Sequence, residues 1–253
     1  ILIVSTIILI LAEYFALRLV NKGQEYAHLA AIINILMFIG IIIVVFLDVI
    51  VQYYNDFKKS QGTLLFLTPN SGYKIVGSKM IFGAAELLLG ISLVVFLAWV
   101  TNSSAVAKGY VGVGPQLQSF VDLLNTGVGE SNSWWIITGF LFLVFLQYTA
   151  GQSIAVTSIT LGRTIFSKNN YNWFWAILFF IAASIAVQTI NGAVLVLVGM
   201  GDGLLSNSIT ITSRSEVTVN ITKYLILGGI EYILWIGISF FVSGLLLNKK
   251  VDI

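Results

Sequence analysis

Long apolar runs separated by short polar connections make up most of this chain. Six of these runs reach or approach about 20 residues, the length that a helix needs to cross a bilayer. They cover 1–17, 29–51, 76–100, the uncharged stretches within 131–162 and 169–201, and 224–247. The runs are continuous rather than alternating, which favours helices over a β-barrel. The pattern predicts an all-α integral membrane protein with six transmembrane helices.

Composition agrees with this class of protein. The chain is 58% hydrophobic and 9% charged, whereas a soluble domain carries about 25% charged residues. No repeat, low-complexity tract or soluble segment interrupts the pattern, so we predict a single transmembrane domain over 1–253. The sequence opens within an apolar run and without a basic flank, and we therefore expect further residues before Ile1 in the full protein.

The residue types needed for several kinds of chemistry are scarce. Cysteine is absent and His28 is the one histidine, which leaves no disulfides and no thiolate metal site. Ser153 is predicted in the inner half of its helix and His28 at the outer end of another, which disfavours a Ser–His enzyme. No phosphate-binding G-x-x-x-x-G-K-[ST] motif occurs, so any ATP hydrolysis belongs to a partner. The net charge of +2 gives no indication of nucleic-acid binding.

Lysine and arginine are unevenly distributed between the two predicted sides of the membrane. One side carries eight: Lys58, Lys59, Lys74, Lys79, Arg163, Lys168, Lys249 and Lys250. The other side carries five: Arg18, Lys22, Lys108, Arg214 and Lys223. Because cytoplasmic loops are enriched in basic residues, we expect the connection 57–80 and the C-terminus in the cytoplasm. The longer connections 101–133 and 202–222 are then expected outside.

The connection 57–80, "FKKSQGTLLFLTPNSGYKIVGSKM", is the most distinctive polar segment. Leu64–Leu67 form one apolar turn, and Pro69 cannot continue a helix. Asn70 or Ser71 is suited to cap the helix that follows. The pattern predicts a short helix, a fixed turn and a helix that enters the membrane. From the residues alone, two interpretations stay open: an amphipathic segment on anionic lipid headgroups, or an element that docks onto a partner protein.

The stretch "LLFLTPNSGYKIVGSKMI" resembles the loop between the second and third helices of ABC-2-type transporter permeases. The resemblance rests on an apolar turn, Thr-Pro, a small polar residue, and the pair Ser78-Lys79 at the opening of the next helix. It implies a coupling helix that docks into a separate ATPase subunit. The implied coupling residues are Leu64, Leu65, Phe66, Leu67, Thr68, Pro69 and Ser71.

The same resemblance implies an exporter in a bacterial cell membrane. Two permease chains, identical or homologous, are expected on two ATPase chains that hold ATP and Mg, while this chain binds no cofactor and contacts membrane lipids. Members of that family usually begin with a basic interfacial helix before the first span, and nothing of it is visible in the sequence from Ile1 onward. Nothing in the sequence identifies the cargo.

Two carboxyl groups lie deep in predicted spans. Glu86 follows Lys79 by seven residues and Glu231 follows Lys223 by eight, so each is about 10–12 Å along its helix from the membrane face. A lipid-facing carboxylate is costly, and we expect each to face protein or water. Contact with cargo and a structural hydrogen bond to another helix both stay open.

Other polar residues in the spans form stripes. In the run within 169–201, Ser184, Gln188 and Asn191 share one helical face, and either a cavity lining or helix packing accounts for them. The helix predicted from the run within 131–162 carries a hydroxyl stripe that either lines a cavity or serves close packing, and packing is the favoured interpretation. The stripe comprises Thr149, Ser153, Thr157, Thr160 and Thr164. Glu13 and Asp48 are predicted at the membrane interface. The predicted translocation path comprises Glu86, Gln188, Asn191 and Glu231.

The leading hypothesis is therefore the permease subunit of an ATP-driven exporter. The alternative is a membrane-embedded binding or scaffold subunit without a transport path of its own. Association with a protein that carries a phosphate-binding loop discriminates between them.

Overall fold

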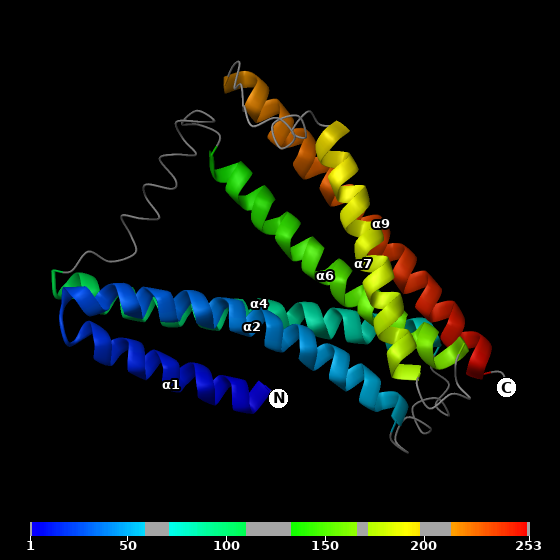
Figure 1. Cartoon of the computed structure of the whole chain (residues 1–253), viewed down its shortest axis with the longest axis horizontal. Helices are drawn as coiled ribbons and strands as arrows, with labels where there is room; N and C mark the ends of the chain where they lie inside the picture. Colours follow the sequence, from blue (N-terminus) through cyan, green and yellow to red (C-terminus); the bar gives the residue numbers. More distant parts are fainter. Residues whose placement is uncertain (1, 59–70, 110–132, 166–171, 198–213, 252–253) are drawn as a thin grey trace. The chain divides into compact units, whose positions relative to one another are not determined.

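A computed structural model describes residues 2–58, 71–109, 133–165, 172–197 and 214–251 (Figure 1). All regular structure in this part of the chain is helical. The six helices are α1 (Leu2–Val20), α2 (Gln24–Lys58), α4 (Gly72–Ala107), α6 (Ser133–Ile165), α7 (Asn172–Leu197) and α9 (Arg214–Val251). The predicted all-α class is thus confirmed.

Five of these helices are long and apolar enough to cross a membrane. They are α2, α4, α6, α7 and α9, and α1, with 19 residues, is not among the five. A multi-pass membrane protein is therefore confirmed, while the crossing by α1 stays a prediction. The predicted coupling helix lies in 59–70, outside the described residues.

The helices extend past the apolar runs that predict them. The helix expected over 76–100 begins at Gly72 and ends at Ala107, and the one expected over 224–247 begins at Arg214. Parts of both expected outer connections are thus helical. In α4 the hydroxyl of Ser103 donates to the carbonyl oxygen of Trp99, and Ser104 donates to Val100 at 2.9 Å. These bonds fold the polar side chains back onto the helix, so a polar sequence does not end it.

The described residues divide into two compact units by their contacts. The first comprises 1–52 and 81–122. Its core is formed by small and apolar side chains, Ala16, Leu19, Val20, Ala30 and Ala105. The helices α2 and α4 approach closely at Gly90, where an added Cβ would lie 2.9 Å from Ile41. The hydroxyl of Thr101 in α4 donates to the buried carboxylate of Glu13 in α1.

The second unit comprises 53–80 and 123–253. Within it α6 packs against both α7 and α9, and α7 also touches α9 (Figure 1). Helices α6 and α9 run in the same direction, and α7 runs opposite to both. Buried side chains from all three helices form its core: Leu143, Leu146, Ala150, Ile154, Val187 and Tyr232.

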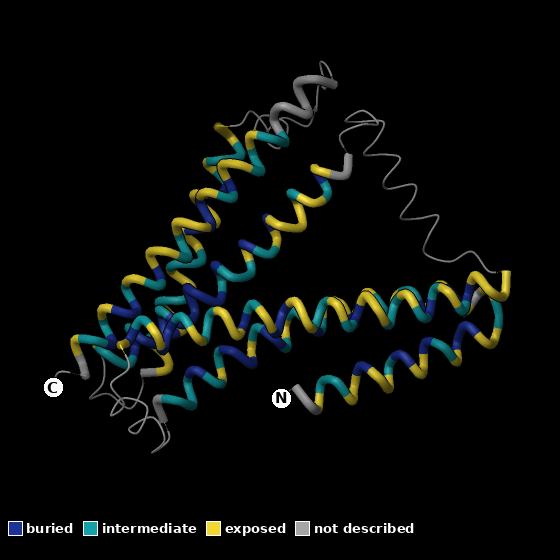
Figure 2. Tube along the Cα trace, turned by 180° about the vertical axis from the view of Figure 1, so that it is seen from behind, coloured by how far each residue is buried: buried dark blue, intermediate teal, exposed yellow. Residues whose placement is uncertain are grey.

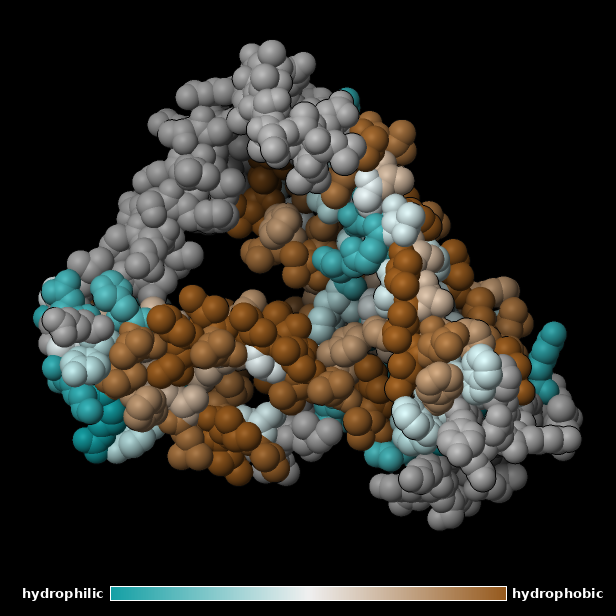
Figure 3. All heavy atoms as spheres, in the orientation of Figure 1, coloured by the Kyte–Doolittle hydropathy of each residue, from teal (hydrophilic) through white to brown (hydrophobic). Residues whose placement is uncertain are grey.

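Buried and exposed positions alternate along each helix (Figure 2), and many of the exposed residues are large and apolar. Leu89 is 70% exposed and Leu141 63% exposed. In the view of Figure 3 the flanks of the described helices are predominantly hydrophobic. A soluble domain rarely exposes apolar surface on this scale, and a hydrocarbon environment removes the cost of doing so.

Candidate functional site

The candidate site consists of the two helix ends that flank segment 59–70 and the parts of α6 and α9 that contact them. We call this group of residues the loop base. It comprises the end of α2 (Tyr53–Asp56), the start of α4 (Gly72–Lys79), Thr160–Arg163 in α6 and Phe240–Asn248 in α9. All four pieces belong to the second unit. Contacts among them determine how the segment that resembles a coupling helix is attached to the protein.

The end of α2 is attached to α6 by two aromatic residues. Tyr53 is buried, and its hydroxyl forms a 2.7 Å hydrogen bond with the Thr160 hydroxyl. The guanidinium of Arg163 lies over the ring of Tyr54, 4.7 Å from its centre, in the arrangement of a cation–π contact. The last turns of α2 are thus attached to α6 through two successive side chains.

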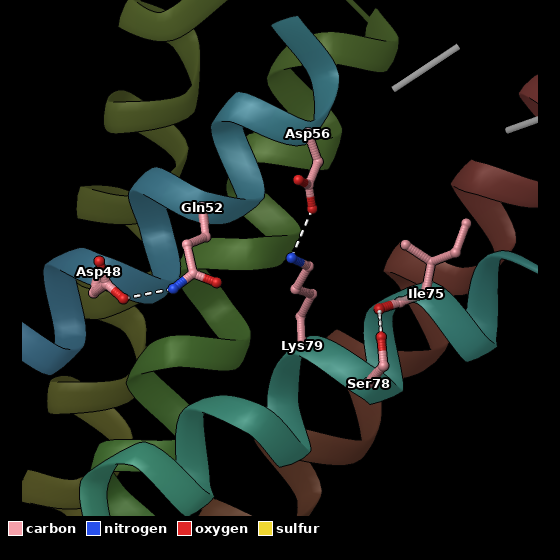
Figure 4. Close-up of polar contacts among 6 residues, drawn as sticks. All are labelled: Asp48, Gln52, Asp56, Ile75, Ser78 and Lys79. Carbon is pink, nitrogen blue, oxygen red and sulfur yellow. Dashed lines mark hydrogen bonds and ion pairs between the residues drawn. The ribbon is translucent and has the colours of Figure 1, made fainter. Parts of the chain in front are cut away.

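An ion pair joins the two stems of the loop directly. Lys79 of α4 reaches Asp56 of α2 with an Nζ–Oδ2 distance of 2.7 Å (Figure 4). The side chains are 23% and 33% exposed, so water screens the pair only in part. Two turns earlier on α2, Gln52 donates to the buried carboxylate of Asp48 at 2.5 Å.

The start of α4 is capped by α9. Ser71 precedes the helix, and its carbonyl oxygen accepts from the Lys74 amide at 2.9 Å, so Ser71 occupies the predicted capping position. The Gly72 amide has no acceptor within its own helix, as is usual for a first turn. It donates instead to the side-chain oxygen of Asn248, at 2.6 Å. The first turn of α4 is therefore fixed to the last turns of α9.

Two glycines allow α4 and α9 to approach this closely. A Cβ added at Gly72 would lie 2.5 Å from the Leu247 Cβ and 2.8 Å from the Gly244 carbonyl oxygen. A Cβ added at Gly244 would overlap the ring of Tyr73. That ring also packs against Phe240, with centroids 5.6 Å apart. Any larger residue at either glycine would push α4 away from α9.

These contacts make the loop base one packed unit. The end of α2 is attached to α6, the start of α4 is attached to α9, and α6 packs on α9. Packed interiors transmit displacement because they are dense and only slightly compressible. A displacement of segment 59–70 is therefore expected to move α6 and α9.

The hydroxyl stripe of α6 serves packing. Thr157 donates to the Ser239 carbonyl oxygen at 3.1 Å and accepts from the Ser243 hydroxyl at 2.9 Å. Thr149 and Ser153 donate to carbonyl oxygens within α6. Hydroxyl bonds between helices are a common form of membrane-helix association, so packing, the favoured interpretation, is the one that these contacts support.

The four residues predicted for a translocation path differ in burial and in the unit to which they belong. Glu86 lies in the first unit and is buried. In the second unit Asn191 and Glu231 are buried, whereas Gln188 is exposed. The Asn191 amide donates to the Tyr232 hydroxyl at 2.7 Å. On the α7 face that these residues were expected to share, Asn191 therefore contacts α9, whereas Gln188 is exposed.

Several residues of the site have little or no signal in the sequence. Of the predicted coupling residues, 64–69 lie outside the described residues, and Ser71 directly precedes the α4 piece of the loop base. Glu13 and Asp48, expected at the interface, are both buried inside the protein. The i, i+4 spacing of Asp48, Gln52 and Asp56 places these side chains on one face of α2, and this spacing is the signal that the sequence offers for a polar face here. Nothing in the sequence pairs Asp56 with Lys79.

The described residues contain no group of three or more His, Asp or Glu side chains able to hold a metal ion. No protein-family model matches the chain, and comparisons with curated proteins and with solved structures find no match either.

Proposed function

We propose that this chain is the permease subunit of an ATP-driven exporter of the ABC-2 type. Two such chains form the translocation path and rest on two copies of a separate ATPase. The apolar turn Leu64–Leu67 docks into a cleft of that ATPase, and Thr68-Pro69 sets the angle of return to α4. The resemblance of segment 64–81 to permease loops is one support for this proposal, and the multi-pass helical fold is another.

The observation that carries the proposal is the attachment of both loop stems. One stem is attached to α6 through Tyr53 and the other to α9 through Gly72. A loop that only rested on headgroups would need no such attachment. A loop that is pushed by a motor needs it, because the force must reach the helices that line the path.

The proposal includes an orientation. The loop base and the C-terminus face the cytoplasm and the connection 101–133 lies outside, in accordance with the eight-to-five distribution of basic residues. The resemblance to ABC-2-type permeases adds the compartment to the proposal, the plasma membrane of a bacterial cell.

Purification of the tagged chain from its native membrane in mild detergent tests the proposal. We expect a protein with a G-x-x-x-x-G-K-[ST] motif to co-purify in equal amount and to hydrolyse ATP. A chain that purifies without any such protein contradicts the proposal and favours the scaffold alternative. A matched control is the same purification after Gly237→Ala, a substitution in α9 outside the loop base with nothing within 4 Å of the added Cβ, which should leave co-purification unchanged.

A further inference from the structure

Three basic side chains gather at the end of the first unit where α1 ends, α2 begins and α4 ends. They are Arg18, Lys22 and Lys108, and all three are exposed. The chain turns back between α1 and α2 at Gly23, whose φ of 145° glycine adopts readily. Lys108 donates to the side-chain oxygen of Asn21, directly before Lys22, so the end of α4 is joined to this turn. Figure 3 shows hydrophilic side chains gathered over the same helix ends.

The partners of these cations are neutral groups. The Arg18 guanidinium donates to the hydroxyl of Tyr14 through two nitrogens, Nε at 2.9 Å and Nη2 at 2.6 Å. The Lys22 ammonium lies over the ring of Tyr26, 6.0 Å from its centre, and Lys108 bonds to a side-chain amide. These contacts orient the three cations without neutralising their charge.

This end of the first unit is therefore positively charged. Segments 14–28 and 101–109 contain three basic residues and one acidic residue, Glu25, so their formal charge is +2 with His28 neutral. Among the described residues, none of the three cations forms an ion pair. An arginine carries five N–H donors and a lysine three, so most of the donors of this group stay available for an anion.

The cations lie at the level where two candidate membrane spans end. The span of α2 begins at Tyr26, and the span of α4 ends at Ala107, one residue before Lys108. Tyrosine is typical of this level, where lipid headgroups meet the hydrocarbon. Within about two helical turns along the spans, Phe15 of α1 and Leu29 of α2 are exposed. A ligand that satisfies this surface has an anionic head and an apolar body.

We propose that the interfacial cluster, which comprises Tyr14, Arg18, Lys22, Tyr26 and Lys108, binds the headgroup of an anionic phospholipid. The three cations donate to its phosphate oxygens, in charge-assisted hydrogen bonds, and the exposed apolar side chains beside them contact its acyl chains. Charge complementarity selects an anionic lipid over a zwitterionic one, whose own headgroup cation neutralises the phosphate. The apolar side chains select a lipid over a free anion. The inference is independent of the proposed function and holds for either orientation in the membrane.

Native mass spectrometry of the purified full-length chain in detergent tests the cluster. The probe is phosphatidylglycerol, and phosphatidylcholine with the same acyl chains is the comparison. We expect phosphatidylglycerol to bind more tightly. Glycerophosphoglycerol, the same headgroup without acyl chains, should bind far more weakly than the lipid.

Two double variants assign the binding to the cluster. Arg18→Gln with Lys22→Gln should weaken binding of phosphatidylglycerol about fivefold for each cation removed. Lys223→Gln with Lys249→Gln is the matched control, because it removes two exposed positive charges from α9 and should leave binding unchanged. Arg18→Lys with Lys22→Arg retains the charge and should bind as the unchanged chain does.

Crosslinking to the unchanged chain keeps the test decisive if the Arg18/Lys22 variant fails to fold. The probe is a phosphatidylglycerol with a photoreactive diazirine in its headgroup, and peptide mass analysis locates the crosslinks. We expect them in segments 14–28 and 101–109, suppressed by unlabelled phosphatidylglycerol but not by phosphatidylcholine. Equal affinity for the two lipids, equal losses in the two charge-removing variants, headgroup binding as tight as lipid binding, or crosslinks spread evenly over the chain would each overturn the proposal.

Discussion

Substitution of Gly244 by alanine tests the close approach of α4 and α9 at the loop base. The added methyl group would overlap the Tyr73 ring. That ring has little room to move, because it packs against Phe240 and Phe241 with centroids 5.6 and 6.1 Å away. Adding a methyl group to a packed interior costs about 1–3 kcal/mol, while replacing glycine within a helix gains about 1 kcal/mol. The expected net effect is a loss of up to about 2 kcal/mol.

The measurement is thermal unfolding of the purified protein in detergent, followed by tryptophan fluorescence. For a chain of this size, a loss of 1 kcal/mol lowers the midpoint by about 2–4 °C, so we expect a decrease of up to about 8 °C. Gly237→Ala is the control in the same helix, since nothing lies within 4 Å of its added Cβ. That variant should be as stable as the unchanged protein or slightly more stable.

A second substitution tests whether overlap with the Tyr73 ring, rather than another effect of alanine, causes the loss of stability. Tyr73→Leu combined with Gly244→Ala should recover much of the loss, because the two changes act on one contact and are therefore not additive. Equal midpoints for Gly244→Ala and Gly237→Ala, or strict additivity with Tyr73→Leu, would refute the reasoning.

Two further predictions concern orientation and the ion pair. In intact cells an impermeant thiol reagent should label Ser103→Cys, which is exposed near the end of α4, and should leave Ser60→Cys unlabelled; the reverse pattern contradicts the proposed topology. Lys79→Gln and Asp56→Asn should each cost about 1 kcal/mol or less, because the pair is partly exposed. The exchange Asp56→Lys with Lys79→Asp should restore most of that loss in the same unfolding assay, and an exchange less stable than either single variant would show that the 2.7 Å contact is not a stabilising pair.

The membrane helices were predictable because one physical requirement dominates them. An apolar run of sufficient length is stable in a bilayer only as a helix. Each of the six predicted runs is helical in the structure, and five of these helices are long and apolar enough to cross a membrane. Their ends were not predictable from apolar length. Ser103 and Ser104 satisfy their hydroxyl groups on the preceding turn of α4, so the helix continues into a sequence that hydropathy assigns to a connection.

The contacts at the loop base could not be predicted, because they join residues that are distant in the sequence. Tyr53 and Thr160 are 107 positions apart, and Gly72 and Asn248 are 176 apart. Hydropathy indicates that a hydroxyl or amide lies in a helix but not which helix it faces. The same limit applies to Gln188 and Asn191, which share an expected face while only Asn191 is buried against α9.

The central claim is that segment 64–67 docks onto an ATPase, and binding of that ATPase to two double variants tests it most directly. Burying one leucine or phenylalanine is worth about 1.5–3 kcal/mol, so Leu65→Ser with Phe66→Ser should weaken binding about a hundredfold or more. Lys58→Gln with Lys59→Gln should change it far less, because exposed charge pairs contribute about 0–1 kcal/mol. The assay is pull-down of the ATPase by the tagged chain, together with its rate of ATP hydrolysis in the complex. Full binding and unchanged hydrolysis by the Leu65/Phe66 variant, with loss of binding in the lysine variant, would contradict the account.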